Sequence, residues 1–281
     1  MILIADSGST KTDWRLIALN GKVFSFKSEG INPYFHSTAT ITETLRRFNL
    51  QPFDHADIKE VYFYGAGCSS DRNRKIMETG FQPVFSGAKI HILHDLLGAA
   101  RALFQNESGI VAILGTGSNS CLYVNDEIVL SLGGQGYILG DEGSGLHLGR
   151  KVVRDFMNDL MPPDILKLFT ETYGLTKDEI SYAVYKKEFP NRFLASFSTF
   201  VSDHLDHPYM QRLAEDAFMK FFQRYVSQYL DYKSYPLRIV GSIGYFFKDQ
   251  IQKQADDFGI KLDRIIRAPI DGLLEYHTKK D

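Results

Sequence analysis

The first 28 residues, MILIADSGSTKTDWRLIALNGKVFSFKS (Met1–Ser28), decide which fold the chain can adopt. Met1–Ala5 is an apolar run of strand length, and the turn-forming residues Ser7–Thr10 separate it from a second strand-like run, Asp13–Leu19. Asn20-Gly21 is a two-residue hairpin signal, after which Lys22–Ser28 alternates apolar and polar residues. The sequence therefore predicts three antiparallel strands at the start of the chain.

Strands and helices alternate from this point on. Ser37 can cap a helix that carries Ile41, Leu45 and Phe48 at helical spacing. Further strands are expected at Val61–Tyr64 and Ile90–Leu93, and further helices at Asp71–Phe81 and Leu96–Phe104. The order of elements in the first half is therefore βββαβαβα.

The second half of the chain restarts the same order. Strands are expected at Ile110–Leu114, Cys121–Val124 and Ile128–Leu132, followed by a glycine-rich loop and by helices from Gly145 to about Tyr232. Later strands are expected at Leu237–Val240 and Lys261–Ile266, on either side of a helix at Tyr245–Phe258. Two such units indicate a duplicated α/β fold with two lobes around a hinged cleft, and one large mixed domain is the alternative.

The division between the lobes is placed after residue 107. The N-terminal lobe spans residues 1–107, and the larger C-terminal lobe spans residues 108–281 and contains the long helical stretch as an insertion. We expect the final helix, about residues 269–281, to pack back on the first lobe.

The composition is that of a globular protein. The chain is 44% hydrophobic, 23% charged and 13% aromatic, which supplies a sizeable core. A net charge of -2 argues against nucleic acid or an anionic membrane as the main partner. The sequence has no apolar run of about 18 residues and no secretory segment, so we expect a cytoplasmic protein in which Cys68 and Cys121 are ordinary buried thiols.

Two turns rich in glycine and hydroxyl residues occupy matching places in the two halves. Their backbone amides and hydroxyls can bind phosphate oxygens, and Asp6, at the end of the first strand, can hold a hydrated magnesium ion. A polar hairpin without a ligand is the alternative for the first turn taken alone. The predicted phosphate-binding residues are Gly8, Ser9, Thr10, Lys11 and Thr12 in the first turn, and Gly115, Thr116, Gly117 and Ser118 in the second.

Two strand-to-helix junctions carry further candidates. Gly241 and Ser242 follow a strand and precede a helix, so they can form a nucleotide platform on which an adenosine approaches the backbone; packing alone is the alternative. Asp95 stands where a strand meets a helix rich in small residues. It can act as a general base for a hydroxyl that attacks a phosphoryl group, or it can simply cap the helix.

The loop GGQGYILGDEGSG (Gly133–Gly145) has six glycines in thirteen residues. Ordering so flexible a backbone is costly, and a polyhydroxylated ligand would use the amide, aromatic and carboxylate groups that the loop contains. The sequence lacks the common phosphate-loop, dinucleotide, nucleophile-elbow and zinc-helix motifs. His91 and His94, which bracket a short strand segment, are interpreted as solvated or core histidines.

Taken in order, the segments DSGSTKT, GINPYF, HDLLGAARAL, ILGTGSNS, GGQGYILGDEGSG and IVGSIG resemble those of the N-acetylglucosamine kinase family, within the sugar-kinase, actin and heat-shock ATPase superfamily. The resemblance spans most of the chain. It implies two ribonuclease H-like lobes with ATP and a sugar in the cleft between them.

The resemblance also implies residue roles. Asp95 matches the base that acts on the sugar 6-hydroxyl, Asp6 matches the residue near magnesium, and Gly241 and Ser242 match the adenosine motif. Asn32, in GINP, matches a contact to a sugar hydroxyl. Tyr137 stands where some relatives have tryptophan. The positions that match the surroundings of the sugar and its N-acyl group lie in the glycine-rich loop, at Gln135, Gly136, Tyr137 and Asp141.

The predicted function is ATP-dependent phosphorylation of an amino sugar at its 6-hydroxyl, with ATP and Mg²⁺ as cofactors. The alternative is an ATPase activator protein of the acyl-CoA dehydratase or reductase type, whose relatives hold an iron–sulfur cluster at a dimer interface. The sequence does not separate N-acetylglucosamine from N-acetylmuramic acid, glucosamine or N-acetylgalactosamine. The oligomeric state is also open, and a homodimer is compatible with the resemblance.

Overall fold

The computed structural model describes residues 1–8 and 10–279. Ser9, one of the predicted phosphate-binding residues, lies outside the described residues, as do the last two residues of the chain. The chain divides into two compact units. The first consists of Met1–Glu107, Asn125–Glu127 and Ala268–Asp281, and the second of Ser108–Val124 and Ile128–Arg267.

The first unit contains a five-stranded sheet in the order β3-β2-β1-β4-β5. The strands are β1 (Ile2–Ser7), β2 (Lys11–Ile17), β3 (Val23–Glu29), β4 (Glu60–Gly65) and β5 (Lys89–His94). The first three are antiparallel neighbours, as predicted, whereas β4 runs parallel to both β1 and β5. The helices are α1 (Thr38–Arg47), the short η1 (His55–Asp57), α2 (Asp71–Phe81), α3 (Asp95–Phe104) and α13 (Ile270–Thr278).

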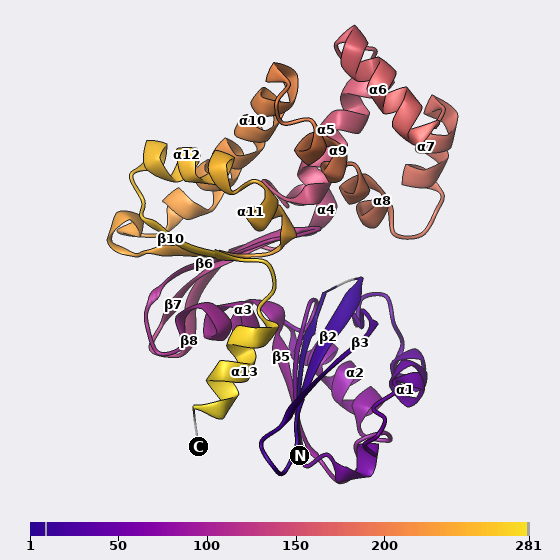
Figure 1. The fold of residues 1–281 in the computed structure, drawn as a ribbon, viewed down its shortest axis with the longest axis vertical. Helices are drawn as coiled ribbons and strands as arrows, with labels where there is room; N and C mark the ends of the chain where they lie inside the picture. The colour runs from indigo at the N-terminus through magenta and orange to yellow at the C-terminus, as the bar shows by residue number, and fades with distance from the viewer. Residues whose placement is uncertain (9, 280–281) are drawn as a thin grey trace. The chain divides into compact units, whose positions relative to one another are not determined.

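Both faces of this sheet are covered, because successive residues of a strand point to opposite faces. Leu3 and Ala5 of β1 belong to the core under α1 and α2, whereas Ile4 packs with Tyr64 and Leu273 on the face of α3 and α13. Figure 1 shows the two pairs of helices on opposite sides of the sheet. The helices thus hold the ends of the parallel strands in place.

The final helix and a short turn complete the first unit. The Gln105 side chain at the end of α3 donates a hydrogen bond to the Gly272 carbonyl of α13 at 3.1 Å. Asp126, in the turn Asn125–Glu127, accepts hydrogen bonds from Arg101 at 3.2 Å and from the Tyr276 hydroxyl at 2.9 Å. These polar contacts join three segments that are far apart in the sequence.

The second unit contains a five-stranded sheet in the order β10-β9-β6-β7-β8. The strands are β6 (Gly109–Leu114), β7 (Ser118–Val124), β8 (Glu127–Gly133), β9 (Leu237–Val240) and β10 (Leu262–Ile266). Read from the other side, this order repeats that of the first sheet strand for strand. The predicted duplicated α/β fold is therefore confirmed.

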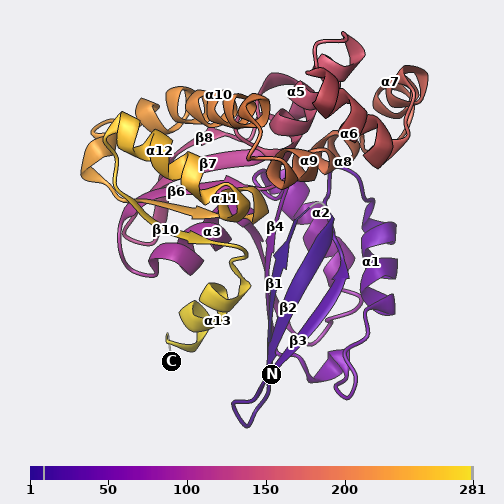
Figure 2. The same cartoon turned by 45° about the horizontal axis from the view of Figure 1, so that its top comes forward.

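The second unit also contains helices, most of them between β8 and β9. They are α4 (Gly136–Leu139), α5 (Gly145–Met157), α6 (Pro163–Tyr173), α7 (Lys177–Tyr185), α8 (Pro190–Ser196), α9 (Ser198–Asp203), α10 (Pro208–Arg224), η2 (Val226–Gln228), η3 (Tyr232–Ser234), α11 (Ser242–Phe246) and α12 (Lys248–Phe258). Figure 2 shows α10 and α12 together over one face of the sheet. The prediction of a single helix at Tyr245–Phe258 is wrong. The structure has two helices, the first of which begins earlier, at Ser242, and the chain turns between them at the buried Phe247.

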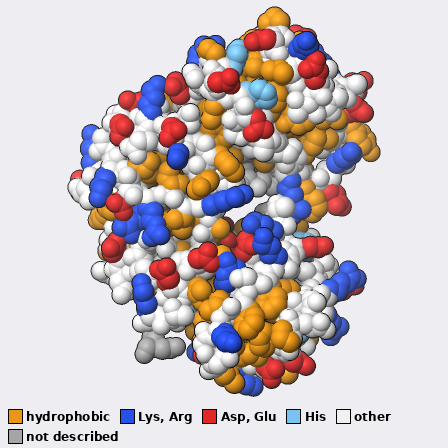
Figure 3. Space-filling view, viewed as in Figure 1, with side chains coloured by type: hydrophobic (Ala, Val, Ile, Leu, Met, Phe, Trp, Pro, Cys, Tyr) orange, Lys and Arg blue, Asp and Glu red, His pale blue; other side chains and the backbone are white. Residues whose placement is uncertain are grey.

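The described surface carries charges of both signs. Figure 3 shows acidic and basic side chains interspersed over the viewed face, as the nearly balanced composition predicts. Within residues 1–8 and 10–279, no helix combines the length and the apolar character needed to cross a membrane.

Candidate active site

The carboxyl ends of three parallel strands gather the candidate acidic groups of the first unit. Ser7 of β1 pairs with Gly65 of β4, and Gly65 pairs with His94 of β5. Asp6 and Asp95 therefore lie at the same edge of the sheet, because each stands at the carboxyl end of its strand. Ligands in open α/β sheets commonly bind at this edge.

Asp6 is in an environment that disfavours its charged form. Burial, followed by the charges of Asp95 and Asp13, raises the pKa of Asp6 to about 7, and Lys11 opposes the shift. Lys11 itself pairs with Asp13 at 2.7 Å. A bound cation would relieve this concentration of negative charge, and magnesium needs only one or two carboxylates besides water and phosphate oxygens. The residues present therefore fit a magnesium ion.

Asp95 is the first residue of α3, and one of its two carboxylate oxygens makes two polar contacts. Its Oδ1 atom accepts a hydrogen bond from the Leu96 backbone N–H at 2.8 Å and lies 3.0 Å from His94 Nε2, an ion-pair contact when the imidazole is protonated. Within the described part of the chain, Oδ2 accepts no hydrogen bond. The contacts at the start of α3 therefore involve only one of the two carboxylate oxygens.

One predicted phosphate-binding group of the first turn, the Thr12 hydroxyl, makes its hydrogen bonds within the protein. The Thr12 side chain is fully buried; its hydroxyl lies 2.8 Å from the Ser7 hydroxyl and donates to the Glu29 carbonyl at 2.9 Å. Thr12 thus supports the turn from within the unit. Gly8 and Thr10 are exposed, and the Lys11 side chain is 63% exposed.

The loop that contains Asn32 is tied to the first turn. Ser7 Oγ accepts a hydrogen bond from the Ile31 backbone N–H at 3.1 Å. The Asn32 side-chain oxygen accepts one from the Tyr34 backbone N–H at 2.9 Å, which closes a local turn. Asn32 is only 5% exposed in this structure, and its contact to a sugar hydroxyl stays a prediction.

The candidate nucleotide groups of the second unit also meet at one sheet edge. The turn Gly115–Gly117 follows β6, Gly241 follows β9, and these two strands are parallel neighbours in which Ile113 pairs with Val240. The first amides of α5 hold the turn, since Gly145 donates to the Gly115 carbonyl at 2.9 Å and Leu146 to the Thr116 carbonyl at 3.1 Å.

Ser118, directly after the second glycine turn, has a buried hydroxyl. Its side chain is 4% exposed, and its hydroxyl makes no hydrogen bond within the described residues. A buried hydroxyl without a partner costs about 1–3 kcal/mol. An unsatisfied hydroxyl in a glycine turn is what a phosphate or sugar oxygen would satisfy.

Gly241 has a packing reason to be glycine. Its φ is +129°, and a Cβ atom there would lie 2.2 Å from the Leu114 carbonyl oxygen. The close approach of β6 and β9 therefore explains this glycine without a ligand. Its predicted contact with adenosine is untested, as is that of the exposed Ser242 at the start of α11.

The glycine-rich loop separates into an exposed part and a buried part. Gln135, Gly136 and Tyr137 are exposed, and the Tyr137 carbonyl accepts a hydrogen bond from Arg150 at 3.1 Å. Asp141 is only 8% exposed, and its Oδ1 accepts a hydrogen bond from the Ser118 backbone N–H at 2.9 Å. Burial raises the pKa of Asp141, although the bond from Ser118 acts in the opposite direction.

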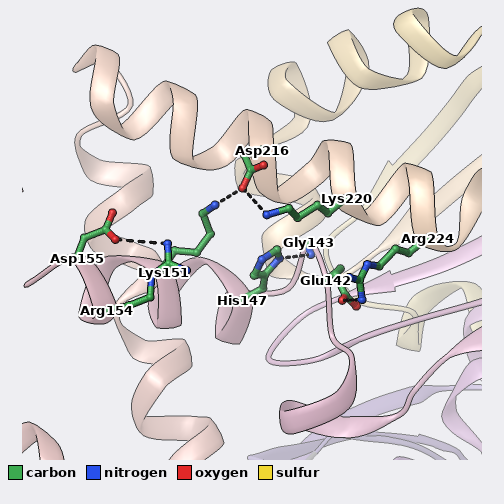
Figure 4. Close-up of polar contacts among 9 residues, drawn as sticks. All are labelled: Glu142, Gly143, His147, Lys151, Arg154, Asp155, Asp216, Lys220 and Arg224. Carbon is green, nitrogen blue, oxygen red and sulfur yellow. Dashed lines mark hydrogen bonds and ion pairs between the residues drawn. The ribbon is translucent and has the colours of Figure 1, made fainter. Parts of the chain in front are cut away.

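Sequence reasoning missed the residues that hold this loop. Glu142 accepts hydrogen bonds from Arg224 at 2.7 Å and from the Tyr225 hydroxyl, both on or next to α10. His147 Nδ1 accepts one from the Gly143 backbone N–H at 2.9 Å, and burial, with Arg150 and Lys151 nearby, lowers the pKa of His147 to about 4. Figure 4 shows Glu142 beside Arg224, and the contact between His147 and Gly143. In the sequence, the signal for the contacts of Glu142 was its position as an acidic residue directly after Asp141. We call the contacts of Glu142 with Arg224 and Tyr225 a brace of the loop.

Comparisons with known proteins agree with this arrangement. No protein-family model matches the chain. A solved structure of a candidate N-acetylglucosamine kinase from Porphyromonas gingivalis is 40% identical, covers 99% of both chains and has a TM-score of 0.93. A candidate N-acetylglucosamine kinase from Chromobacterium violaceum is 19% identical over 98% of both chains, and its TM-score of 0.79 shows the same fold.

A curated relative matches a shorter region. An N-acetylmuramic acid/N-acetylglucosamine kinase from Clostridium acetobutylicum is 26% identical over 156 residues, which are 53% of this chain and 51% of that protein. The match therefore spans about half the length of this relative.

The duplicated α/β fold is that of the two-lobe sugar kinases. The identity with the Porphyromonas gingivalis protein extends over nearly the whole chain. The chain belongs to the N-acetylglucosamine kinase family.

Both cysteines are free and buried, Cys68 in the first unit and Cys121 in the second. This confirms the prediction that they are ordinary buried thiols.

Proposed function

We propose that the protein transfers the γ-phosphoryl group of ATP to the 6-hydroxyl of an amino sugar, N-acetylglucosamine or a close relative such as N-acetylmuramic acid. The family supports the class of reaction and of substrate. The observation that carries the proposal is the Asp95 carboxylate: Oδ1 accepts from the Leu96 N–H and lies 3.0 Å from His94 Nε2, whereas Oδ2 accepts no hydrogen bond from the described residues.

The proposed chemistry needs little beyond positioning. Asp95 Oδ2 takes the proton of the sugar hydroxyl, the hydroxyl oxygen bonds to the γ-phosphorus, and the bond from that phosphorus to the bridging oxygen of ADP breaks. The products are ADP and the sugar phosphate, and the proton remains on Asp95. Magnesium, for which Asp6 is the proposed contact, supplies charge neutralisation at the phosphates when it is bound.

The nucleotide contacts are proposed for the two turns and for the junction after β9. In the first unit these are the exposed Gly8 and Thr10 together with Lys11, while Thr12 supports the turn. In the second unit the unsatisfied hydroxyl of Ser118 is the strongest support for a ligand. The remaining proposed nucleotide contacts are Ser9, Gly115, Thr116, Gly117, Gly241 and Ser242.

The sugar contacts are proposed for one loop in each unit. Asn32 stands in the first unit, and Gln135, Gly136, Tyr137 and Asp141 stand in the glycine-rich loop of the second. Asp141 already accepts a hydrogen bond from the Ser118 backbone N–H, which restricts its carboxylate before a ligand binds. Tyr137 exposes an aromatic side chain that suits the apolar face of a sugar or its N-acyl group.

A panel of sugars tests this proposal. ADP release is measured with N-acetylglucosamine, N-acetylmuramic acid, glucosamine, N-acetylgalactosamine and a 6-deoxy analogue, and the product is examined by phosphorus NMR. We expect sugar-stimulated ADP release, a phosphate on O6, and no product from the 6-deoxy sugar. Absence of stimulation by every sugar, or a phosphate on another oxygen, would contradict the proposal.

A further inference from the structure

His94 immediately precedes Asp95, at the point where β5 ends and α3 begins. We infer that His94 is a positioning residue for Asp95, whose Oδ1 atom it holds so that Oδ2 is presented to the sugar hydroxyl. This inference rests on the proposed role of Asp95 as the base. His94 itself is not assigned any contact with the substrate.

The backbone explains why the imidazole can reach its neighbour. His94 is in the extended conformation, with φ -74° and ψ 141°, and Asp95 begins the helix. His94 occupies the N-cap position, but its side chain makes no capping hydrogen bond. The imidazole Nε2 instead lies 3.0 Å from Asp95 Oδ1, within ion-pair distance of the carboxylate.

A hydrogen bond and an ion-pair contact on the same oxygen restrict the carboxylate more than the hydrogen bond alone. With only the Leu96 N–H at 2.8 Å, the carboxylate could still turn about its last bond, because that torsion is broad in aspartate. The imidazole adds a second anchor on the same atom. A general base must lie within about 2.6–3.2 Å of the proton-bearing oxygen, so a fixed carboxylate plane favours turnover.

The charges around the pair support the contact. Burial lowers the pKa of His94, but the hydrogen bond to Asp95 and the charge of Asp95 outweigh it, so that the net shift is upward. The other charge that acts on the imidazole is that of Arg74, which opposes this shift and is itself paired with Asp71. Both side chains of the His94–Asp95 pair are 23% exposed, so solvent weakens the contact only in part.

The chain contains a matched control in His91, three residues earlier on the same strand. Its ring stacks on Tyr62, with ring centroids 4.5 Å apart and an interplanar angle of 4°. No hydrogen bond or ion pair joins His91 to Asp95 among the described residues. A substitution of His91 therefore shows the effect of removing an imidazole from β5 that does not contact Asp95.

The test uses three substitutions of His94 that differ in reach. In His94→Gln the amide nitrogen can take the place of Nε2, whereas in His94→Asn the amide is too short to reach Oδ1, and His94→Leu has no donor. Initial rates with ATP and with the best amino sugar give kcat and KM for each variant, for His91→Gln and for Asp95→Asn. Thermal unfolding shows that each variant is folded.

We expect His94→Asn and His94→Leu to lose roughly 10- to 100-fold in kcat with KM values within about threefold of the parent, since a misplaced catalytic group costs turnover more than binding. His94→Gln and His91→Gln should retain kcat within about threefold. If His94→Leu does not fold, the Gln and Asn variants decide the question by themselves.

Equal kcat values for His94→Gln and His94→Asn, or a parent-like kcat for a folded His94→Leu, would overturn the inference. Failure of the proposed function is a different result. In that case the parent protein itself shows no turnover with any sugar, or Asp95→Asn is as active as the parent.

Discussion

The Asp141 carboxylate accepts a hydrogen bond from the Ser118 backbone N–H at 2.9 Å, which joins the glycine-rich loop to the second glycine turn. The two segments are 23 residues apart and belong to the same unit. A residue proposed to contact the sugar is thereby attached to a turn proposed to contact the nucleotide. Changes in either segment should affect the other.

Gly117→Ala tests this connection. A Cβ atom at residue 117 would lie 2.8 Å from Asp141 Oδ1, so the carboxylate must move and its bond from Ser118 is weakened. A hydrogen bond to a charged group is worth about 1.5–3 kcal/mol, and we expect the free energy of unfolding to fall by about that amount. Urea denaturation measures the loss, and nucleotide titration should show weaker ATP binding.

Gly115→Ala is the control, because a Cβ atom there would meet nothing within 4 Å. Its free energy of unfolding should change by no more than about 0.5 kcal/mol. Equal losses in the two variants would mean that the turn merely requires glycine, and no loss in either would mean that the connection to Asp141 contributes little.

Glu142→Ala should destabilise the second unit. The Glu142 side chain is 9% exposed, and its removal leaves the Tyr225 hydroxyl and Arg224 without their acceptor. We expect a loss of about 1–3 kcal/mol in the free energy of unfolding, because the buried Tyr225 hydroxyl would lose its partner, whereas the exposed Arg224 can bind water. Denaturant unfolding measures this directly.

An exposed glutamate provides the comparison for that variant. Glu171 is 60% exposed and lies 3.9 Å from Lys167, a surface pair that is worth at most about 1 kcal/mol. Glu171→Ala should therefore be nearly neutral. A loss in Glu142→Ala no larger than that in Glu171→Ala would contradict the role of Glu142 as a brace.

Asp6 should make stability depend on pH. Its pKa is about 7 in the folded protein against 3.8 for an unperturbed aspartate, so between these values the folded state keeps a proton that the unfolded state has released. Stability from this group is then lost as the pH rises from about 4 to about 7. Asp6→Asn should thus gain stability over the parent as the pH increases from 5 to 8.

Thermal unfolding without nucleotide or divalent ions measures that difference. Addition of magnesium chloride at pH 8 should stabilise the parent more than Asp6→Asn, because the ion binds the charged carboxylate. A difference between the two proteins that is the same at pH 5 and pH 8 would rule out the raised pKa.

Local patterns predicted most of the fold. The strand at Leu237–Val240 and the helix at Asp71–Phe81 have the expected bounds, because short apolar runs and helical spacing are properties of a few neighbouring residues. The break between α11 and α12 was not predictable in this way. Phe247 is buried there against Phe218, with ring centroids 5.5 Å apart, a contact between distant segments.

The sequence likewise predicted only part of the candidate site. Asp6 and Asp95 were each predicted at the end of a strand, and the structure places both strand ends at one sheet edge. His91 and His94, in contrast, look equivalent in the sequence, and only the fold shows that one stacks on Tyr62 while the other holds Asp95. Side-chain direction at the end of a strand decides this difference, and residue spacing does not specify it.

Asp95→Asn measured for both binding and turnover tests the central claim most directly. Calorimetric titration gives the ATP affinity with magnesium present, and initial rates of ADP release give kcat with the best amino sugar. We predict an affinity within about threefold of the parent and a kcat about 100- to 10,000-fold lower, since only the base is lost. A kcat close to that of the parent would show that Asp95 does not accept the proton.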